Sequence, residues 1–206
     1  VLRKTIKALK KDNPELFIKL HDNATVQDLL RKPYSTWDQA GELAKTVSEV
    51  NDRLKKAQYR LRFISLNEPD MRLLLGELGN SHAAASAAYL ACRNKPSEPL
   101  LHKFRKKSKT FMYQLVFFRH LSPQTVRQLE KKLASMTQNL GRYNDLAQIM
   151  TLTGYRLGAS GNTVANDELA VVIRDRQDRY LAKVWPVAYR IFAPGLKLQD
   201  LLGISF

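Results

Sequence analysis

The sequence lacks the features that mark secreted and membrane-spanning proteins. Its single cysteine, Cys92, cannot form a disulfide within the chain, which is compatible with a reducing compartment. The alanines near it, Ala87, Ala88 and Ala91, indicate a small packing residue rather than a nucleophile. No apolar run approaches the roughly 20 residues that a membrane-spanning helix needs. We therefore expect a soluble chain, and these absences favour a cytoplasmic location.

Motifs of common hydrolases and nucleotide-binding enzymes are also missing. The sequence contains neither the phosphate loop G-x-x-x-x-G-K-[ST] nor the nucleophile turn G-x-S-x-G. His21, His82 and His120 are not spaced with cysteines or carboxylates as metal ligands would be. No carboxylate cluster suited to Mg²⁺ is visible. We therefore expect no catalytic residue, no metal and no cofactor in these 206 residues, and no enzymatic activity.

Glycine and proline are sparse, with nine and eight residues, so long segments run without a helix breaker. The hydrophobic residues in these segments follow helical rather than alternating periodicity, which predicts an all-α protein. Short connections between long helices favour antiparallel bundle packing. The expected helices cover residues 2–11, 25–32, 36–65, 69–93, 98–120, 123–157 and 163–192.

Acidic residues are few beside the basic ones. The chain has 34 Lys and Arg against 19 Asp and Glu, which gives a net charge of +15 and an isoelectric point near 10.0. Such a field attracts polyanions and speeds their encounter with the protein. The charge therefore predicts an acidic partner, which on this ground alone is a nucleic acid, an anionic membrane or a phosphate polymer.

The stretch 99–129 has no acidic residue at all and is expected to be helical. On a helix its apolar residues gather on one face, which we expect to pack into a core. These residues are Leu101, Phe104, Phe111, Leu115 and Phe118. A second face carries His102, Arg105, Lys106, Lys109 and Tyr113. Without a carboxylate to neutralise them, its cations repel one another, and a bound anion would relieve that repulsion.

An internal repeat divides the chain. Residues 46–54, T-V-S-E-V-N-D-R-L, resemble residues 138–146, Q-N-L-G-R-Y-N-D-L, and residues 2–7, L-R-K-T-I-K, align with residues 104–109, F-R-K-K-S-K. In this register the position that matches His102 falls immediately before Val1. The repeat predicts two helical-bundle halves, about 1–95 and 98–206, built from duplicated antiparallel hairpins. Packed about a pseudo-twofold axis, they would bring both basic helices to one groove.

Two of these motifs together resemble a known family. The helix motif His102-x-x-Arg105-Lys106-x-x-Lys109 followed by Leu140-Gly141-Arg142-x-Asn144-Asp145-Leu146 is similar to the second repeat of a CHAD domain, the conserved histidine α-helical domain. The resemblance implies that residues 1–206 form a single domain of two symmetry-related halves. It also implies non-enzymatic binding of inorganic polyphosphate, or a similar phosphate-rich polyanion, in a central basic groove. The chain departs from the family pattern by carrying T-F-M at 110–112, where a further arginine is common.

The resemblance and the repeat assign candidate binding residues. These are Arg3, Lys4, Lys7, Lys10, His102, Arg105, Lys106, Lys109, Tyr113 and Arg142. Arginine grips phosphate oxygens with a two-pronged fork and lysine contributes a flexible point charge. Asn51, Asp52, Asn144 and Asp145 are expected to orient the basic side chains. For the single Asp in each half, pairing with a neighbour such as Arg105 or Arg142 is favoured over metal binding.

Two further hypotheses remain open at this stage. A helical protein that binds RNA or the backbone of duplex DNA shares the charge, but it should show aromatic side chains among its surface cations. The basic face carries only Tyr113, and we expect Trp37 and Trp185 to pack between helices rather than to stack on bases. An enzyme of phosphate metabolism would need catalytic residues in flanking sequence. Membrane-surface binding is disfavoured because the apolar face of the basic helix is needed for the core.

Overall fold

The computed structural model describes residues 2–21, 24–31, 40–62, 71–153 and 164–203. Within these ranges the chain forms helices and turns without a β-strand, which confirms the predicted all-α class. No helix there is both long enough and hydrophobic enough to cross a membrane. The helices are α1 (Leu2–Asp12), α2 (Pro14–Lys19), α3 (Ala24–Leu30), α4 (Ala40–Arg62), α5 (Met71–Asn94), α6 (Glu98–Leu115), α7 (Pro123–Leu152), α8 (Val164–Phe192) and α9 (Leu198–Leu202), with a 3₁₀ turn, η1 (Val116–Phe118), after α6.

Each predicted helix has a counterpart among the described residues, and the predicted positions 32, 36–39, 63–65, 69–70, 154–157 and 163 lie outside them. The helix expected over 98–120 ends as an α-helix at Leu115 and continues as η1. Helices α2 and α9 were not predicted, because five or six residues are too short to show a helical period. Ser97 and Ser122 occupy the positions before α6 and α7, but neither side chain caps the helix. Trp37 lies outside the described residues.

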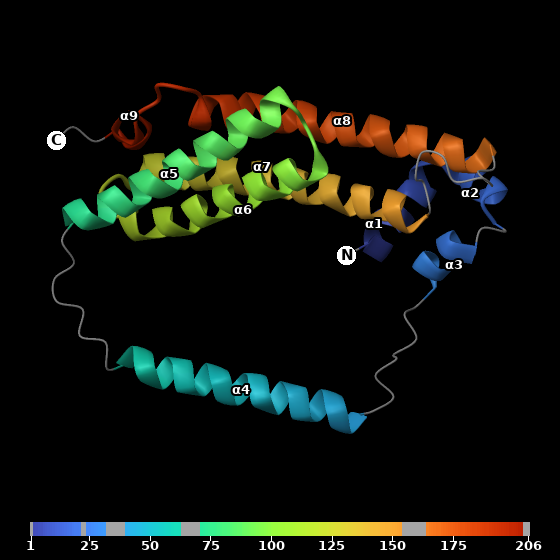
Figure 1. Cartoon of the computed structure of the whole chain (residues 1–206), viewed down its shortest axis with the longest axis horizontal. Helices are drawn as coiled ribbons and strands as arrows, with labels where there is room; N and C mark the ends of the chain where they lie inside the picture. The colour runs from blue at the N-terminus through green and yellow to red at the C-terminus, as the bar shows by residue number, and fades with distance from the viewer. Residues whose placement is uncertain (1, 22–23, 32–39, 63–70, 154–163, 204–206) are drawn as a thin grey trace.

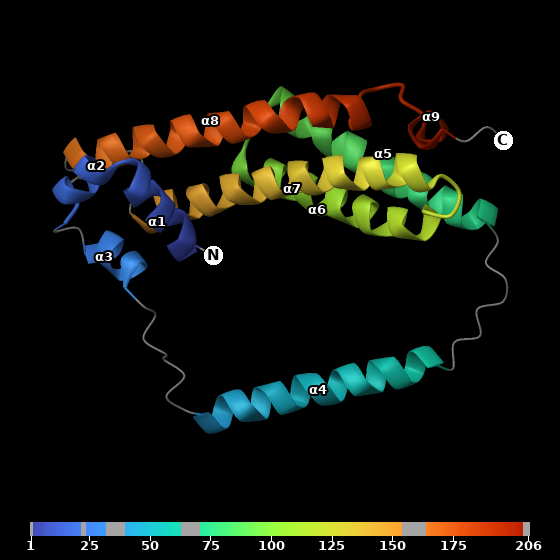
Figure 2. The same ribbon diagram turned by 180° about the vertical axis from the view of Figure 1, so that it is seen from behind.

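Helices α7 and α8 run side by side and form the centre of the molecule (Figure 1). Helices α5 and α6 lie along the part of this pair that is nearer to the C-terminus of α8, while α1, α2 and α3 gather at the opposite end (Figure 2). Two hydrophobic cores result, one at each end of the α7–α8 pair. The larger core joins α5 and α6 to the pair, and the smaller one joins α1, α2 and α3 to it.

The larger core contains the predicted apolar face of α6. Its members Leu101, Phe104, Phe111, Leu115 and Phe118 are all buried, which confirms that this face packs inward. His82 of α5 stacks on Phe192 with the ring centroids 5.6 Å apart, and its Nε2 lies 2.7 Å from the carbonyl oxygen of Ile191. That contact satisfies a polar atom inside the core, so His82 is a packing residue rather than a metal ligand.

Cys92 also belongs to the larger core. The residue is fully buried, and its Sγ donates a hydrogen bond to the carbonyl oxygen of Tyr89 over 3.2 Å. Burial raises the pKa of the thiol to about 11, so the group stays protonated near neutral pH. The interpretation of Cys92 as a packing residue is confirmed.

The smaller core fixes the position of α1. Ile6 and Leu9 of α1 are fully buried against a cluster that includes Leu146 and Ile149 of α7 and Ile173 of α8. An ion pair between Arg176 and Asp12 joins α8 to the end of α1. A second, between Lys19 and Glu168 at 2.8 Å, joins α2 to the start of α8. Together these contacts place the basic helix α1 across α7 and α8.

Helix α4 lies apart from the other helices in both views (Figures 1 and 2). Every side chain from 44 to 60 is exposed. Val47, Val50 and Leu54, which recur at helical spacing, are 50%, 49% and 62% exposed. The predicted arrangement of two equivalent halves is therefore not shown. Helix α6 packs along α7, whereas α1 packs on α7 and α8 through its own apolar residues and has no α4 beside it.

The exposure of α4 generates a stability prediction. Leu54→Glu should change the free energy of unfolding by no more than about 0.5 kcal/mol, as at other exposed positions. Phe104→Ala should lower it by about 3–5 kcal/mol, because it opens a cavity in the larger core. Urea denaturation followed by circular dichroism measures both. A loss above about 1.5 kcal/mol for Leu54→Glu would mean that α4 packs against other helices in solution.

Candidate functional site

A cleft of about 650 Å³ opens where α1, α6, α7 and α8 meet. On α7 its lining residues run from Gln138 to Asp145, beside Leu140 of the larger core and Leu146 of the smaller one, and on α8 they lie between Ile173 and Val184. The cleft therefore sits at the seam between the two cores. Its lining residues are Lys4, Thr5, Ala8, Arg105, Gln138, Gly141, Arg142, Asp145, Arg176 and Tyr180. We call it the basic cleft.

Positive charge dominates the basic cleft. Four helices each contribute one cation, which are Lys4, Arg105, Arg142 and Arg176, against the single carboxylate of Asp145. The charge of Arg176 is paired with Asp12, but the others leave a net excess. A cleft whose walls carry one sign of charge concentrates the field and draws in ions of the opposite sign. The lining therefore suits an anion.

Arg105 is held against the surface of α7. Its Nε donates a hydrogen bond to the carbonyl oxygen of Thr137 over 3.2 Å. The guanidinium passes directly over Gly141, where a Cβ would lie only 3.3 Å from Nε and 3.4 Å from Nη2. A glycine at this position lets the guanidinium lie close to the helix. Arg105 has further N–H donors beyond the one that binds Thr137, and it can direct them at an anion.

His102 is held one turn further along the same pair of helices. The amide Nδ2 of Asn144 lies 2.9 Å from Nδ1 of His102. Because an amide nitrogen donates, Nδ1 accepts, and a neutral ring then carries its proton on Nε2. The spacing of three residues in both motifs places His102 opposite Asn144 and Arg105 opposite Gly141 on antiparallel helices. The two motifs that the sequence singled out thus form one structural unit.

Asp145 lies beside these residues on the wall of the basic cleft. Burial raises the pKa of its carboxyl group, while the positive charge of Arg105 opposes that shift. The sequence predicted that Asp145 would accompany Arg105 or Arg142, and all three line the same cleft. The arrangement gives Asp145 an electrostatic partner in Arg105 rather than a set of metal ligands.

The outer face of α6 continues from the cleft into solvent. His102, Lys106 and Tyr113 are exposed and Lys109 is partly buried. The Nζ of Lys109 lies 5.8 Å from the centre of the Tyr113 ring, at a distance typical of a cation–π contact. The predicted basic face of α6 is therefore present as one surface, with Arg105 at its inner edge.

Of the candidate residues predicted in the first half of the chain, some line the basic cleft and others lie away from it. Lys4 lines the basic cleft, and Arg3 is partly buried with its Nε enclosed and without a hydrogen-bond partner among the described residues. Lys7 and Lys10 are exposed on α1 and do not line the cleft. Asn51 and Asp52 are exposed on α4, far from α1 (Figure 1). Their predicted role in orienting the α1 cations is not seen in this arrangement, because α4 does not pack beside α1.

Two lining residues on α8, Arg176 and Tyr180, were not predicted. The sequence places Arg176 among alternating charges that indicate an ion-paired surface, and Arg176 does pair with Asp12. Tyr180 follows one turn later, and its ring lies under Arg142, with Cζ 5.8 Å from the ring centre. A cation–π contact of this kind holds the Arg142 guanidinium toward the cleft. The one sequence signal that could have indicated them is the four-residue spacing of Arg176 and Tyr180, which puts both on one face of a helix.

Metal chemistry finds no support in the described ranges, which contain no group of three or more His, Cys, Asp or Glu residues that could hold a metal ion. The basic cleft offers N–H donors from arginine and lysine instead. Such donors bind phosphate or carboxylate oxygens.

The environment of Asp145 predicts a dependence of stability on pH. Its folded pKa is raised, so the native state holds this proton more tightly than the unfolded chain, and the carboxyl group lowers stability as pH rises through the folded pKa. Asp145→Asn should therefore be more stable than the unmodified chain near pH 7, and the difference should shrink on acidification to about pH 4. Urea denaturation across this range tests it. Asp167→Asn, at an exposed carboxylate, is the control, and equal pH profiles for both variants would contradict the prediction.

Comparison with known proteins agrees with the motifs. The family model described as the CHAD domain matches residues 3–153, which is more than two thirds of the chain. Neither the curated proteins nor the solved structures yielded a match. The matched range includes α1, the His102 and Arg105 helix, and the Gly141–Asn144 segment that holds it. The chain therefore belongs to the CHAD domain family.

Proposed function

We propose that the chain binds inorganic polyphosphate in the basic cleft and along the adjoining face of α6, and that it does so without catalysing a reaction. The observation that carries the proposal is the convergence of Lys4, Arg105 and Arg142 from three helices on one cleft. Membership of the CHAD domain family is consistent with a role related to polyphosphate.

The chemistry of the ligand matches the groups on this surface. Each phosphate unit of the polymer carries roughly one negative charge and only oxygen acceptors, so recognition depends on N–H donors. Arg105 and Arg142 are already oriented, by Thr137 and Gly141 in one case and by the Tyr180 ring in the other. Such preorganisation lowers the entropy lost on binding. These two arginines therefore act as anchors, while Lys106 and Lys109 neutralise the polymer along α6.

The Nε–H of Arg3, which has no acceptor among the described residues, also supports anion binding. An enclosed N–H without an acceptor costs free energy, and a phosphate oxygen would relieve that cost. Packing of α4 beside α1, as the internal repeat predicts, would bring Asn51 and Asp52 toward Arg3 and would complete a groove shared by both halves. We propose this closed arrangement for the polyphosphate-bound chain, whereas the stability prediction for Leu54→Glu applies to the ligand-free chain.

Nucleic-acid binding is the second candidate, and the aromatic residues distinguish it. Tyr113 lies on the proposed surface and Tyr180 lines the basic cleft, and each has a cation over its ring, Lys109 in one case and Arg142 in the other. Base stacking would compete with these cations for the ring faces. The arrangement therefore favours a ligand that offers phosphate without bases.

A competition assay tests the proposal directly. Labelled long-chain polyphosphate is displaced by unlabelled polyphosphate, RNA or duplex DNA at one near-physiological salt concentration. Arg105→Glu/Lys109→Glu should weaken polyphosphate binding by at least about tenfold, since it removes charge-assisted hydrogen bonds worth about 1.5–3 kcal/mol each. Affinity should also fall steeply with salt, because neutralised phosphates release counterions.

The matched control changes the same helix by the same charge. Lys103→Glu/Lys107→Glu alters two exposed residues that lie more than about 100° around α6 from Arg105 and Lys109, so it should keep most of the affinity. If both double variants lose binding equally, or if RNA competes as well as polyphosphate per charge, the surface is a general cationic one and the proposal fails.

Gly141→Ala separates binding from stability. Alanine favours a helix over glycine by about 1 kcal/mol, but its Cβ would push the Arg105 guanidinium outward and so strain its bond to Thr137. Stability should therefore stay within about 1 kcal/mol of the unmodified chain, while polyphosphate affinity falls by about tenfold. Gly76→Ala in α5, where a Cβ meets nothing within 4 Å, should leave affinity unchanged. Unchanged binding by Gly141→Ala would show that Arg105 is not an anchor.

A further inference from the structure

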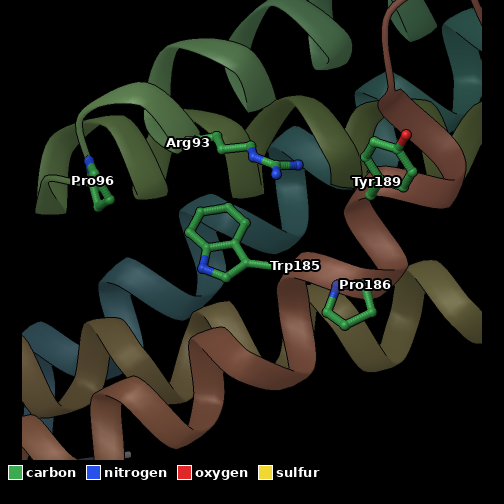
Figure 3. Close-up of a pocket in the computed structure, with 5 residues that line it drawn as sticks. All are labelled: Arg93, Pro96, Trp185, Pro186 and Tyr189. Carbon is green, nitrogen blue, oxygen red and sulfur yellow. The ribbon is translucent and has the colours of Figure 1, made fainter.

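A second cleft, of about 610 Å³, lies where the end of α5 and the connection to α6 face α8. Its lining consists of Arg93, Pro96, Trp185, Pro186 and Tyr189, which Figure 3 shows arranged around an open space. No residue of this lining belongs to the basic cleft. We call it the aromatic cleft.

The aromatic side chains of this cleft are held by the larger core. The Trp185 ring rests on the buried Tyr89, with ring centres 6.3 Å apart, and Tyr89 in turn lies 5.8 Å from Phe104. Trp185 thus packs between helices as predicted, but it is only partly buried and also lines the cleft. The platform is therefore fixed before any ligand arrives.

Arg93 is held in place by contacts with Tyr89 and Tyr189. Its Nη1 donates a hydrogen bond of 2.6 Å to the hydroxyl of Tyr89, and its Cζ lies 6.0 Å from the Tyr89 ring centre and 5.7 Å from that of Tyr189. Tyr189 remains 56% exposed. Trp185, Arg93 and Tyr189 therefore line one surface of the cleft (Figure 3), and the Arg93 guanidinium contacts the Tyr89 and Tyr189 rings.

The hydrogen-bonding groups on this surface are mainly donors. The indole of Trp185 and the guanidinium of Arg93 can only donate, the Tyr189 hydroxyl can donate, and the prolines offer no N–H. A matching ligand therefore carries carbonyl acceptors and few donors. A proline-rich segment has this character, because proline lacks the N–H and its extended polyproline conformation leaves the carbonyl groups unpaired.

Shape and charge add two further requirements. Trp185 and Tyr189 stand one helical turn apart on α8, and aromatic side chains in grooves of this kind receive proline rings. The fixed positive charge of Arg93 favours an acidic side chain beside the prolines. We propose that the aromatic cleft binds an extended, proline-rich segment of a partner protein that carries Asp or Glu next to its prolines.

A nucleotide is the principal competing ligand for an aromatic cleft with an arginine. A base edge, however, needs acceptors as well as donors from the protein, and this lining supplies chiefly donors. Peptide binding is therefore favoured, and nucleotide binding is an outcome that the experiment tests.

The experiment uses Trp185 as a fluorescent reporter in the Trp37→Phe chain, since the sequence has two tryptophans. The probes are blocked peptides of eight prolines flanked by two aspartates at each end, the same core flanked by lysines, a Gly-Ser core flanked by aspartates, and ATP. The aspartate-flanked proline peptide should bind at least tenfold more tightly than either control peptide. The Gly-Ser peptide measures the general attraction of this basic chain for acidic ligands.

Two exposed positions locate the binding. Tyr189→Ala should weaken the preferred peptide at least fivefold, and Arg93→Gln should remove the preference for aspartate over lysine flanks while leaving some binding to the proline core. Phe117→Ala, at another exposed aromatic residue, and Arg105→Glu/Lys109→Glu should leave peptide affinity within twofold. Polyphosphate binding by Tyr189→Ala should be unchanged, so the two sites are tested separately. Thermal melts identify any variant that fails to fold.

Four results would overturn the proposal, and the first three concern relative affinity. These are equal binding of the proline and Gly-Ser cores, tighter binding of ATP than of any peptide, and peptide affinity that survives both Tyr189→Ala and Arg93→Gln. A fluorescence signal that fails to respond to any proline peptide would do the same.

Discussion

The packing of α7 against α8 is the interaction on which the rest of the structure depends. Both hydrophobic cores draw residues from these two helices, Leu133 and Val184 in the larger core and Ile149 and Ile173 in the smaller one. The pair therefore acts as a common support that aligns α6 from one core with α1 from the other. The basic cleft is a result of that alignment, since neither core alone brings Lys4 near Arg105. Burial of apolar surface pays the cost of assembling like charges that would otherwise repel one another.

The two family motifs contact each other where α6 packs on α7. Gly141 leaves room for the Arg105 guanidinium, and Asn144 contacts the imidazole of His102. One segment of α7 thus orients the two side chains of α6 that lie at the edge of the cleft. Asp145 belongs to the same segment. Burial raises the pKa of its carboxyl group, and the positive charge of Arg105 partly offsets that rise. The spacing that the sequence shows in two distant motifs is the spacing of one antiparallel helix contact.

Much of the architecture could be predicted from periodicity and charge. The apolar and basic faces of α6 were assigned correctly because a helix of 18 residues repeats its pattern several times. The relation between the halves could not be predicted, since the repeat aligns motif residues and says nothing about which helices touch. Arg176 and Tyr180 were missed because their role depends on the side that α8 turns toward α1, and the smaller core decides this. Trp185 was assigned to packing, and the open space on its other side depends on Arg93 and Pro96 from a distant part of the chain.

The buried thiol of Cys92 has a practical consequence. It is the chain's sole cysteine, and a protonated, enclosed sulfur reacts slowly with maleimides and iodoacetamides, which attack thiolates. A cysteine introduced on an exposed face of α4 and another on α6 would therefore be the preferred sites of dye attachment. The native sequence thus already provides a low-background scaffold for measuring the separation of these helices by fluorescence energy transfer.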